Sequence, residues 1–256
     1  MPGKTPLLLM HGLLSSRHGW QLNIEALRGH FRLVFAELPG HGEAAGCTEP
    51  ARLHPDALVA ALEEARQRLQ IARWHLCGLS FGAGLTLRYA LRHPGAVLSQ
   101  IWTNGNRALT DPPDAALLAA DEARCQRLAA QGVDALRQES FHPRHGRRFP
   151  PELRDRLSAD ADGVDIPSVI ALTRHCLPDL SVRAQFGRTA VPTLLVNGRL
   201  ESRFQPVRDL ATRLLPICEV ADLRGGHAIN IEQPEAFNDA ALEFLRRHDF
   251  ADAHAG

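Results

Sequence analysis

An apolar segment that runs into a glycine-rich turn, WHLCGLSFGAG, occupies residues 74–84. Residues 74–77 are mostly apolar, as in a buried strand, and residues 78–82 carry the spacing Gly-x-Ser-x-Gly around Ser80. In such a turn a strand passes sharply into a helix, and the serine hydroxyl is held above the sheet in a strained backbone conformation. The apolar pattern of residues 85–91 predicts that helix. The stretch therefore indicates a nucleophilic serine between a strand and a helix.

Strand and helix patterns alternate on both sides of this turn. Apolar runs predict strands at residues 5–10, 32–37, 97–103, 192–198 and 217–223. Helical periodicity predicts helices at residues 55–69, 206–214 and 234–247. This alternation is typical of a mostly parallel sheet with right-handed crossovers and helices on both faces. We therefore expect an α/β fold.

The segment between the fourth and fifth of the six expected strands has a different pattern. It shows helical runs at residues 115–131, 133–139, 151–158 and 166–175, and no convincing buried strand. A helical block at this place is most simply a lid over the carboxyl edge of the sheet, where ligands bind in such folds. We therefore expect a core of residues 1–106 and 191–256, with an inserted helical cap of residues 107–190.

The composition limits the classes of protein that the chain can represent. Its 256 residues are 45% hydrophobic and 23% charged, with a formal net charge of +0, so no global charge attracts nucleic acid or an anionic membrane. No apolar run approaches the ~20 residues of a membrane span, and none resembles a secretory signal. The five cysteines include no C-x-x-C pair, which favours reduced thiols in a cytoplasmic protein. The histidines show no metal-binding spacing and there is no dinucleotide loop, so we expect no metal and no cofactor.

Three polar residues match the chemistry that a Gly-x-Ser-x-Gly turn serves. Ser80, Glu201 and His227 occur in the order serine, acid, histidine, each just past the end of an expected strand. Parallel strands end at the same edge of a sheet, so the three side chains can converge. Ser80 would attack a carbonyl carbon, His227 would take its proton and Glu201 would orient the imidazole. Asp111 and Asp222 remain alternative acids.

Further groups are candidates for binding the substrate. The backbone N–H groups of Leu13, after a His-Gly pair, and of Phe81, at a helix N-terminus, are candidate oxyanion donors. His11 is a candidate substrate-binding residue beside the first of them. In the expected cap, Arg144 and Arg148 could bind a substrate carboxylate or phosphate. The alternative is that this basic cluster is a solvated charged face.

Taken together, these segments resemble the α/β-hydrolase superfamily over nearly the whole chain. The matching pieces are LLLMHGLLSS, ELPGHG, GLSFGAG, PTLLVNGRLESRF and GGHAINIEQPEAF. Residues 201–204 and 226–237 are similar to the menaquinone-pathway cyclohexadiene-carboxylate synthase group, whose members use the triad for proton abstraction and pyruvate elimination. That group has an arginine where this chain has Gly84, and most relatives have an aspartate where it has Glu201.

The resemblance and the residues together imply an enzyme. We expect a serine hydrolase that cleaves a carboxylic ester, thioester or lactone through an acyl-enzyme on Ser80, with a small-molecule acyl substrate and no nucleic-acid partner. The alternatives are a lyase of the menaquinone-synthase type, using the same triad, and a binding protein that retains the fold without catalysis. The acyl chain, the leaving group and the oligomeric state cannot be read from these patterns.

Overall fold

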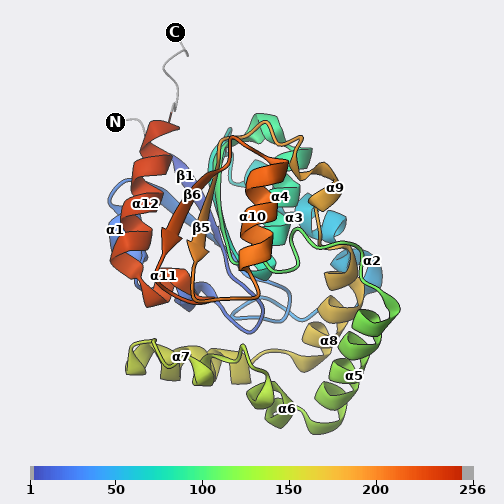
Figure 1. Cartoon of the computed structure of the whole chain (residues 1–256). Helices are drawn as coiled ribbons and strands as arrows, with labels where there is room; N and C mark the ends of the chain where they lie inside the picture. The colour runs from blue at the N-terminus through green and yellow to red at the C-terminus, as the bar shows by residue number, and fades with distance from the viewer. Residues whose placement is uncertain (1–2, 250–256) are drawn as a thin grey trace.

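The computed structural model describes residues 3–249, in which a six-stranded parallel sheet is covered by helices on both faces (Figure 1). The strands are β1 (Pro6–Met10), β2 (Arg32–Ala36), β3 (Trp74–Leu79), β4 (Val97–Thr103), β5 (Thr193–Gly198) and β6 (Glu219–Leu223). Their spatial order is β2-β1-β3-β4-β5-β6, and every neighbouring pair is parallel. All six expected strands are present. The last begins two residues later than expected, because Ile217 lies in a turn and is 69% exposed.

The helices include all those that the periodicity predicts. They are α1 (Ile24–Arg28), α2 (Pro50–Leu53), α3 (Pro55–Arg68), α4 (Phe81–Arg92), α5 (Ala115–Gln131), α6 (Val133–Gln138), α7 (Pro151–Asp162), α8 (Ile166–His175), α9 (Arg183–Phe186), α10 (Gln205–Leu214), α11 (Ile229–Glu232) and α12 (Pro234–Arg247). Residues 3–249 also contain four short 3₁₀ turns: η1 (Arg17–Trp20), η2 (Pro94–Ala96), η3 (Pro143–His145) and η4 (Leu177–Asp179). Within residues 3–249, no helix is long and apolar enough to cross a membrane.

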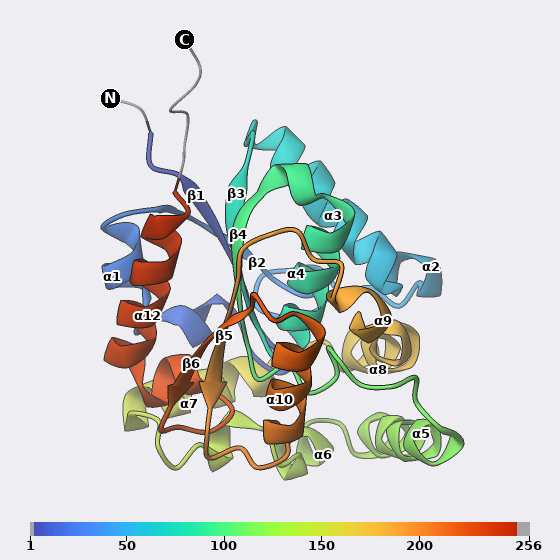
Figure 2. The same ribbon diagram turned by 45° about the horizontal axis from the view of Figure 1, so that its top comes forward.

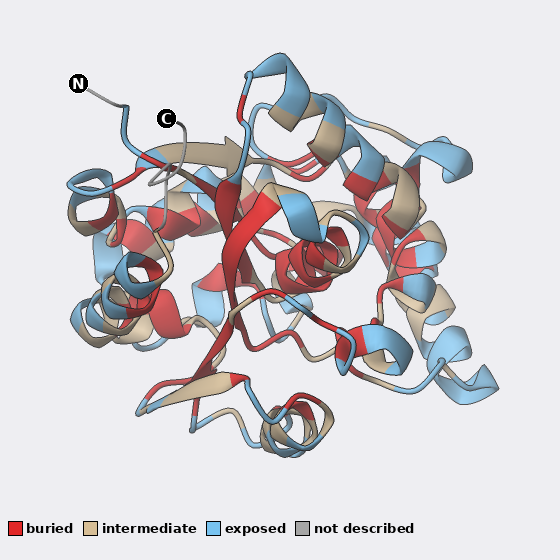
Figure 3. Cartoon of the chain, turned by 90° about the horizontal axis from the view of Figure 1, so that it is seen from above, coloured by how far each residue is buried: buried red, intermediate tan, exposed pale blue. Residues whose placement is uncertain are grey.

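Two hydrophobic clusters form on opposite faces of the sheet because alternate strand residues point in opposite directions. Leu7 of β1 packs on the side of α1 and α12, in a cluster that includes Phe244. Leu8, the next residue, packs on the side of α3 and α4, in a cluster that includes Leu85. Figures 1 and 2 show these two helical layers, and Figure 3 shows the strands buried between them. The helices therefore cover the two faces of the sheet, and its carboxyl edge is left to be covered by other segments.

Helices α5 to α8 lie beyond the carboxyl ends of the strands, as Figures 1 and 2 show. Leu128, Leu136 and Ala161 of this segment pack against Leu14, in the loop after β1. Farther along the chain, Phe186 already packs with Trp102 of β4, so the chain has returned to the sheet by α9. We propose that the part that contains α5 to α8 is the cap. It is held through these contacts with Leu14 and through Leu172 of α8, which packs in the cluster of Leu8.

The turn at Ser80 is tight because β3 ends at Leu79 and α4 begins at Phe81. Ser80 has φ 52° and ψ −111°, a conformation that L-residues seldom adopt. The helix then passes close to β1: a Cβ atom on Gly82 would lie 2.5 Å from the backbone oxygen of His11 and 2.7 Å from that of Met10. Only glycine fits this approach without moving the backbone.

Replacing Gly82 with alanine is therefore expected to lower the free energy of unfolding by about 2–3 kcal/mol, the usual cost of overpacking a rigid site. Urea denaturation of the purified variants measures this. Gly95→Ala is the matched control, because a Cβ there meets no atom within 4 Å. Equal stability of the two variants would contradict the close approach at Gly82.

Candidate active site

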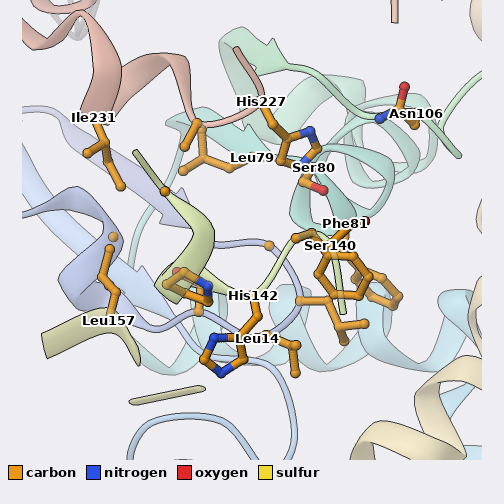
Figure 4. Close-up of a pocket in the computed structure, with 18 of the residues that line it drawn as sticks. Leu14, Leu79, Ser80, Phe81, Asn106, Ser140, His142, Leu157, His227 and Ile231 are labelled. Carbon is orange, nitrogen blue, oxygen red and sulfur yellow. The ribbon is translucent and has the colours of Figure 1, made fainter. Parts of the chain in front are cut away.

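A cavity of about 630 Å³ lies between the carboxyl edge of the sheet and the proposed cap. Ser80 and His227 lie side by side on one wall, and His142 lies across from them (Figure 4). The sheet side contributes Gly12, Leu13, Leu14, Ser80, Phe81, Glu201 and His227, and the cap side contributes Arg124, Ser140, Phe141, His142, Phe149 and Leu157. The cavity is lined mainly by apolar surface and contains a few polar groups, as small-molecule sites usually do.

His227 and Glu201 form a close pair at the edge of this cavity. The Nδ1 atom of His227 lies 2.9 Å and 3.0 Å from the two carboxylate oxygens of Glu201. The Glu201 side chain is 15% exposed, and that of His227 is 39% exposed. This contact places an N–H on Nδ1, which leaves Nε2 as the nitrogen that can accept a proton.

The Glu201 carboxylate is also bound by two asparagines that we did not predict. Asn104 Nδ2 donates to one oxygen, and Asn106 Nδ2 donates to the other at 2.6 Å. Burial raises the pKa of Glu201, but the hydrogen bond and charge of His227, with the two amide donors, outweigh it and lower that pKa overall. The carboxylate therefore stays ionised. Both asparagines follow the end of β4, so the rule that located Glu201 and His227 could have located them.

The two alternative acids lie elsewhere and have other partners. Asp111 pairs with Arg183 at 2.8 Å, and its side chain is 75% exposed. Asp222, at the end of β6, accepts hydrogen bonds from Asn197 and Arg208. Of the three acids considered, the structure brings Glu201 to His227.

Ser80 lines the cavity beside the two expected oxyanion donors. It occupies the N-cap position of α4, but its side chain makes no capping hydrogen bond, so its hydroxyl is not engaged in stabilising the helix. Among residues 3–249, the N–H groups of Leu13 and Phe81 have no hydrogen-bond acceptor. Phe81 is the first residue of α4, where N–H groups have no partner inside the helix.

The position of His11 corrects our expectation that it binds substrate. His11 is 0% exposed and does not line the cavity. Its Nε2 accepts the N–H of Leu38, and its Nδ1 lies 2.7 Å from the Gly12 oxygen. His41 is arranged in the same way, with Nε2 accepting the N–H of Leu14. The two imidazoles therefore fix the loop that carries Leu13.

Burial, together with the neighbouring His41, lowers the pKa of His11 to about 4, and burial lowers the pKa of His41 to about 4. The folded protein thus keeps both rings neutral down to about pH 4, whereas the unfolded chain protonates them near pH 6.5. Between these values the unfolded state binds more protons, so we expect the free energy of unfolding to fall as the pH drops from 6.5 to 4, by up to about 3 kcal/mol for each histidine.

Urea titrations at pH 7, 5.5 and 4.5 measure this loss. In His41→Gln, the amide oxygen can accept the Leu14 N–H but does not titrate, so the loss between pH 7 and 4.5 is expected to be smaller than in the wild-type protein. An equal loss in the variant would contradict the assignment to His41.

The two cap arginines that we expected to bind substrate also lie outside the cavity lining. Arg144 does not line the cavity; it borders a separate hollow with Arg137 and Asp162. Arg148 also lies outside the lining and pairs with Glu232 at 3.1 Å. Our expectation that these two residues bind substrate is therefore not supported by their positions. The arginines that do line the cavity are Arg107, Arg124 and Arg203.

In the part of the chain that the structure describes, no cluster of three or more His, Cys, Asp or Glu residues is arranged to hold a metal ion.

Known proteins share the sequence pattern and the fold of this chain. The family model described as "alpha/beta hydrolase fold" matches residues 5–234. RutD of Pantoea ananatis, provisionally named a carbamate hydrolase, is 28% identical over 251 residues, which cover 94% of this chain and 88% of that protein. The 3-oxoadipate enol-lactonase 2 of Acinetobacter baylyi is 26% identical, with the same coverage of 94% and 88%.

Solved structures have the same fold at lower identity. MenH from S. aureus superposes with a TM-score of 0.85 at 19% identity, covering 97% of this chain and 96% of that one. The chain therefore belongs to the α/β-hydrolase family. It is an enzyme of that family, and the two sequence relatives described above are named as a carbamate hydrolase and an enol-lactonase.

Proposed function

We propose that the chain is a serine hydrolase that cleaves a carboxylic ester, thioester or lactone of a small molecule through an acyl-enzyme on Ser80. The observation that carries this proposal is the pair of His227 and Glu201 at 2.9 Å, on the wall of the same cavity as Ser80. The names of RutD and the enol-lactonase, which describe hydrolysis of carbonyl compounds, support it.

Each group has one task in the proposed reaction. Ser80 Oγ attacks the carbonyl carbon while its proton passes to His227 Nε2, and Glu201 stabilises the imidazolium that forms. The N–H groups of Leu13 and Phe81 bind the negative charge on the former carbonyl oxygen. The imidazolium then returns its proton to the leaving group, and the acyl-enzyme forms. A water molecule, deprotonated by His227, attacks this acyl-enzyme. The imidazolium then gives that proton to Ser80 Oγ as the acyl–oxygen bond breaks and the acid leaves.

A panel of esters, acyl-CoA thioesters and lactones tests the proposal, with Ser80→Ala as the blank. We expect wild-type protein to hydrolyse at least one class and Ser80→Ala to hydrolyse none above background. Turnover by Ser80→Ala above background would show that Ser80 is not the nucleophile. If folded wild-type protein hydrolysed no substrate of any class, the proposed hydrolase activity would be wrong.

The second candidate is a lyase that uses the same triad for proton abstraction and pyruvate elimination. The three arginines on the cavity wall favour it, since such a substrate carries several carboxylates. Gly84 counts against it, because a Cβ there would lie 2.6 Å from Leu180 Cγ, so Leu180 fills the space beside this position. Incubation with a carboxylated cyclohexene substrate of the menaquinone pathway, with pyruvate release followed by coupled lactate dehydrogenase, separates the two reactions.

A further inference from the structure

Arg124 reaches the cavity from α5 in the proposed cap. Its side chain is 12% exposed, and its guanidinium lies 4.9 Å from the centre of the Phe141 ring. Its Nε lies 3.4 Å from Glu139 Oε1, and Arg127 approaches the same oxygen at 3.9 Å. The three charged groups, Arg124, Arg127 and Glu139, therefore carry a net charge of +1 beside the cavity.

The guanidinium of Arg124 is incompletely hydrogen-bonded by the protein. Its Nε and Nη2 atoms are buried, and neither has a hydrogen-bond acceptor among residues 3–249. Buried donors on a charged group are costly when they are unpaired. On a guanidinium, Nε and Nη2 lie along one edge and together match the two oxygens of a carboxylate.

The acidic residues that line the cavity do not pair with Arg124. The acids that line the cavity, Glu201 and Glu232, are already engaged: Glu201 by His227, and Glu232 by the Gly226 N–H. Arg203 also lines the cavity, but it is exposed, and within residues 3–249 its side chain has neither a hydrogen bond nor an ion pair. Arg107, the third arginine of the lining, is paired with Asp121 at 2.7 Å. The cations of the lining that are left without a full acidic partner are therefore Arg203 and Arg124, which shares Glu139 with Arg127.

We propose that Arg124 binds a carboxylate that the substrate carries in addition to its scissile carbonyl. This inference rests on the proposed function and narrows its substrate class to esters, thioesters or lactones of a dicarboxylic or similarly anionic acid. Arg124 thereby takes the role that we had expected of Arg144 and Arg148. The Nε–Nη2 edge of the Arg124 guanidinium suits one planar carboxylate.

Two matched substrates test the proposal by turnover: the mono-4-nitrophenyl ester of glutarate, which carries a free carboxylate, and 4-nitrophenyl pentanoate, which does not. In Arg124→Gln we expect the ratio of kcat/KM for the anionic ester to that for the neutral ester to fall at least tenfold, mainly through KM. Arg127→Gln is the control, because Arg127 contacts the same Glu139 oxygen but does not line the cavity. An unchanged ratio in Arg124→Gln, or an equal fall in Arg127→Gln, would overturn the proposal.

Calorimetric titration with glutarate tests the same contact without turnover. In the Ser80→Ala protein we expect glutarate to bind, and adding Arg124→Gln to weaken the affinity at least tenfold. Absence of binding, or equal affinity in the two proteins, would overturn the carboxylate site. Because this titration needs no hydrolysis, it decides the question even if wild-type protein hydrolyses no ester, an outcome that would contradict only the proposed function.

Discussion

His227→Ala is expected to lower kcat/KM on any hydrolysed substrate by roughly 10⁴- to 10⁶-fold. Without the imidazole, no group at the wall takes the proton from Ser80, and a neutral serine hydroxyl is a weak nucleophile. The fold should survive, because the His227 side chain is 39% exposed and, within residues 3–249, hydrogen-bonds only to Glu201. Steady-state kinetics on the best substrate of the panel measure the loss.

The matched control for this variant is His30→Ala. His30 is an exposed histidine outside the cavity, where it contacts Arg246. We expect the kcat/KM of His30→Ala to remain within twofold of the wild-type value. Circular dichroism should show that His227→Ala and His30→Ala are both folded. Activity of His227→Ala close to that of His30→Ala would show that another group takes the proton.

Glu201→Gln is expected to lower kcat by roughly 10³- to 10⁴-fold while the fold is retained. The carboxylate accepts hydrogen bonds at both oxygens, from His227 and from the amides of Asn104 and Asn106. A glutamine carries no charge, so the imidazolium loses the anion that stabilises it. The NH₂ group of the glutamine would also face one of these donors, which would lose its acceptor.

Asp111→Asn and Asp222→Asn are the controls for Glu201. Both acids have partners away from His227, so we expect each variant to keep kcat within about threefold of wild type. If Glu201→Gln were nearly as active as wild type and Asp222→Asn were inactive, the orienting acid would be Asp222. Kinetics of the three variants at pH 7 decide between these outcomes.

The sheet could be predicted from sequence because its strands have strong local patterns. Residues 97–103 were expected as a strand and form β4, and residues 234–247 were expected as a helix and form α12. The expected start of the last strand was wrong because Ile217 is apolar and β-branched, as strand residues are, yet lies exposed in the turn before β6. A local pattern does not report whether an apolar residue is covered by the rest of the fold.

The convergence of Ser80, Glu201 and His227 could be expected from topology, since parallel strands end at one edge. In contrast, the sequence does not predict which arginine of the cap lines the cavity. Arg124 and Arg144 both belong to the inserted helical segment, and only its docking through residues such as Leu128 decides which of them faces the cavity. The sequence likewise does not reveal that His11 is covered by Leu38 and Gly12 rather than open to a ligand.

The central claim is that Ser80 is the nucleophile, and covalent labelling tests it most directly. Wild-type protein and Ser80→Ala would be incubated with a fluorophosphonate, and the intact mass and the modified peptide measured by mass spectrometry. We expect one adduct per wild-type chain, located on Ser80, and none on Ser80→Ala. A folded wild-type protein that takes up no label, or an adduct that persists in Ser80→Ala, would contradict the claim.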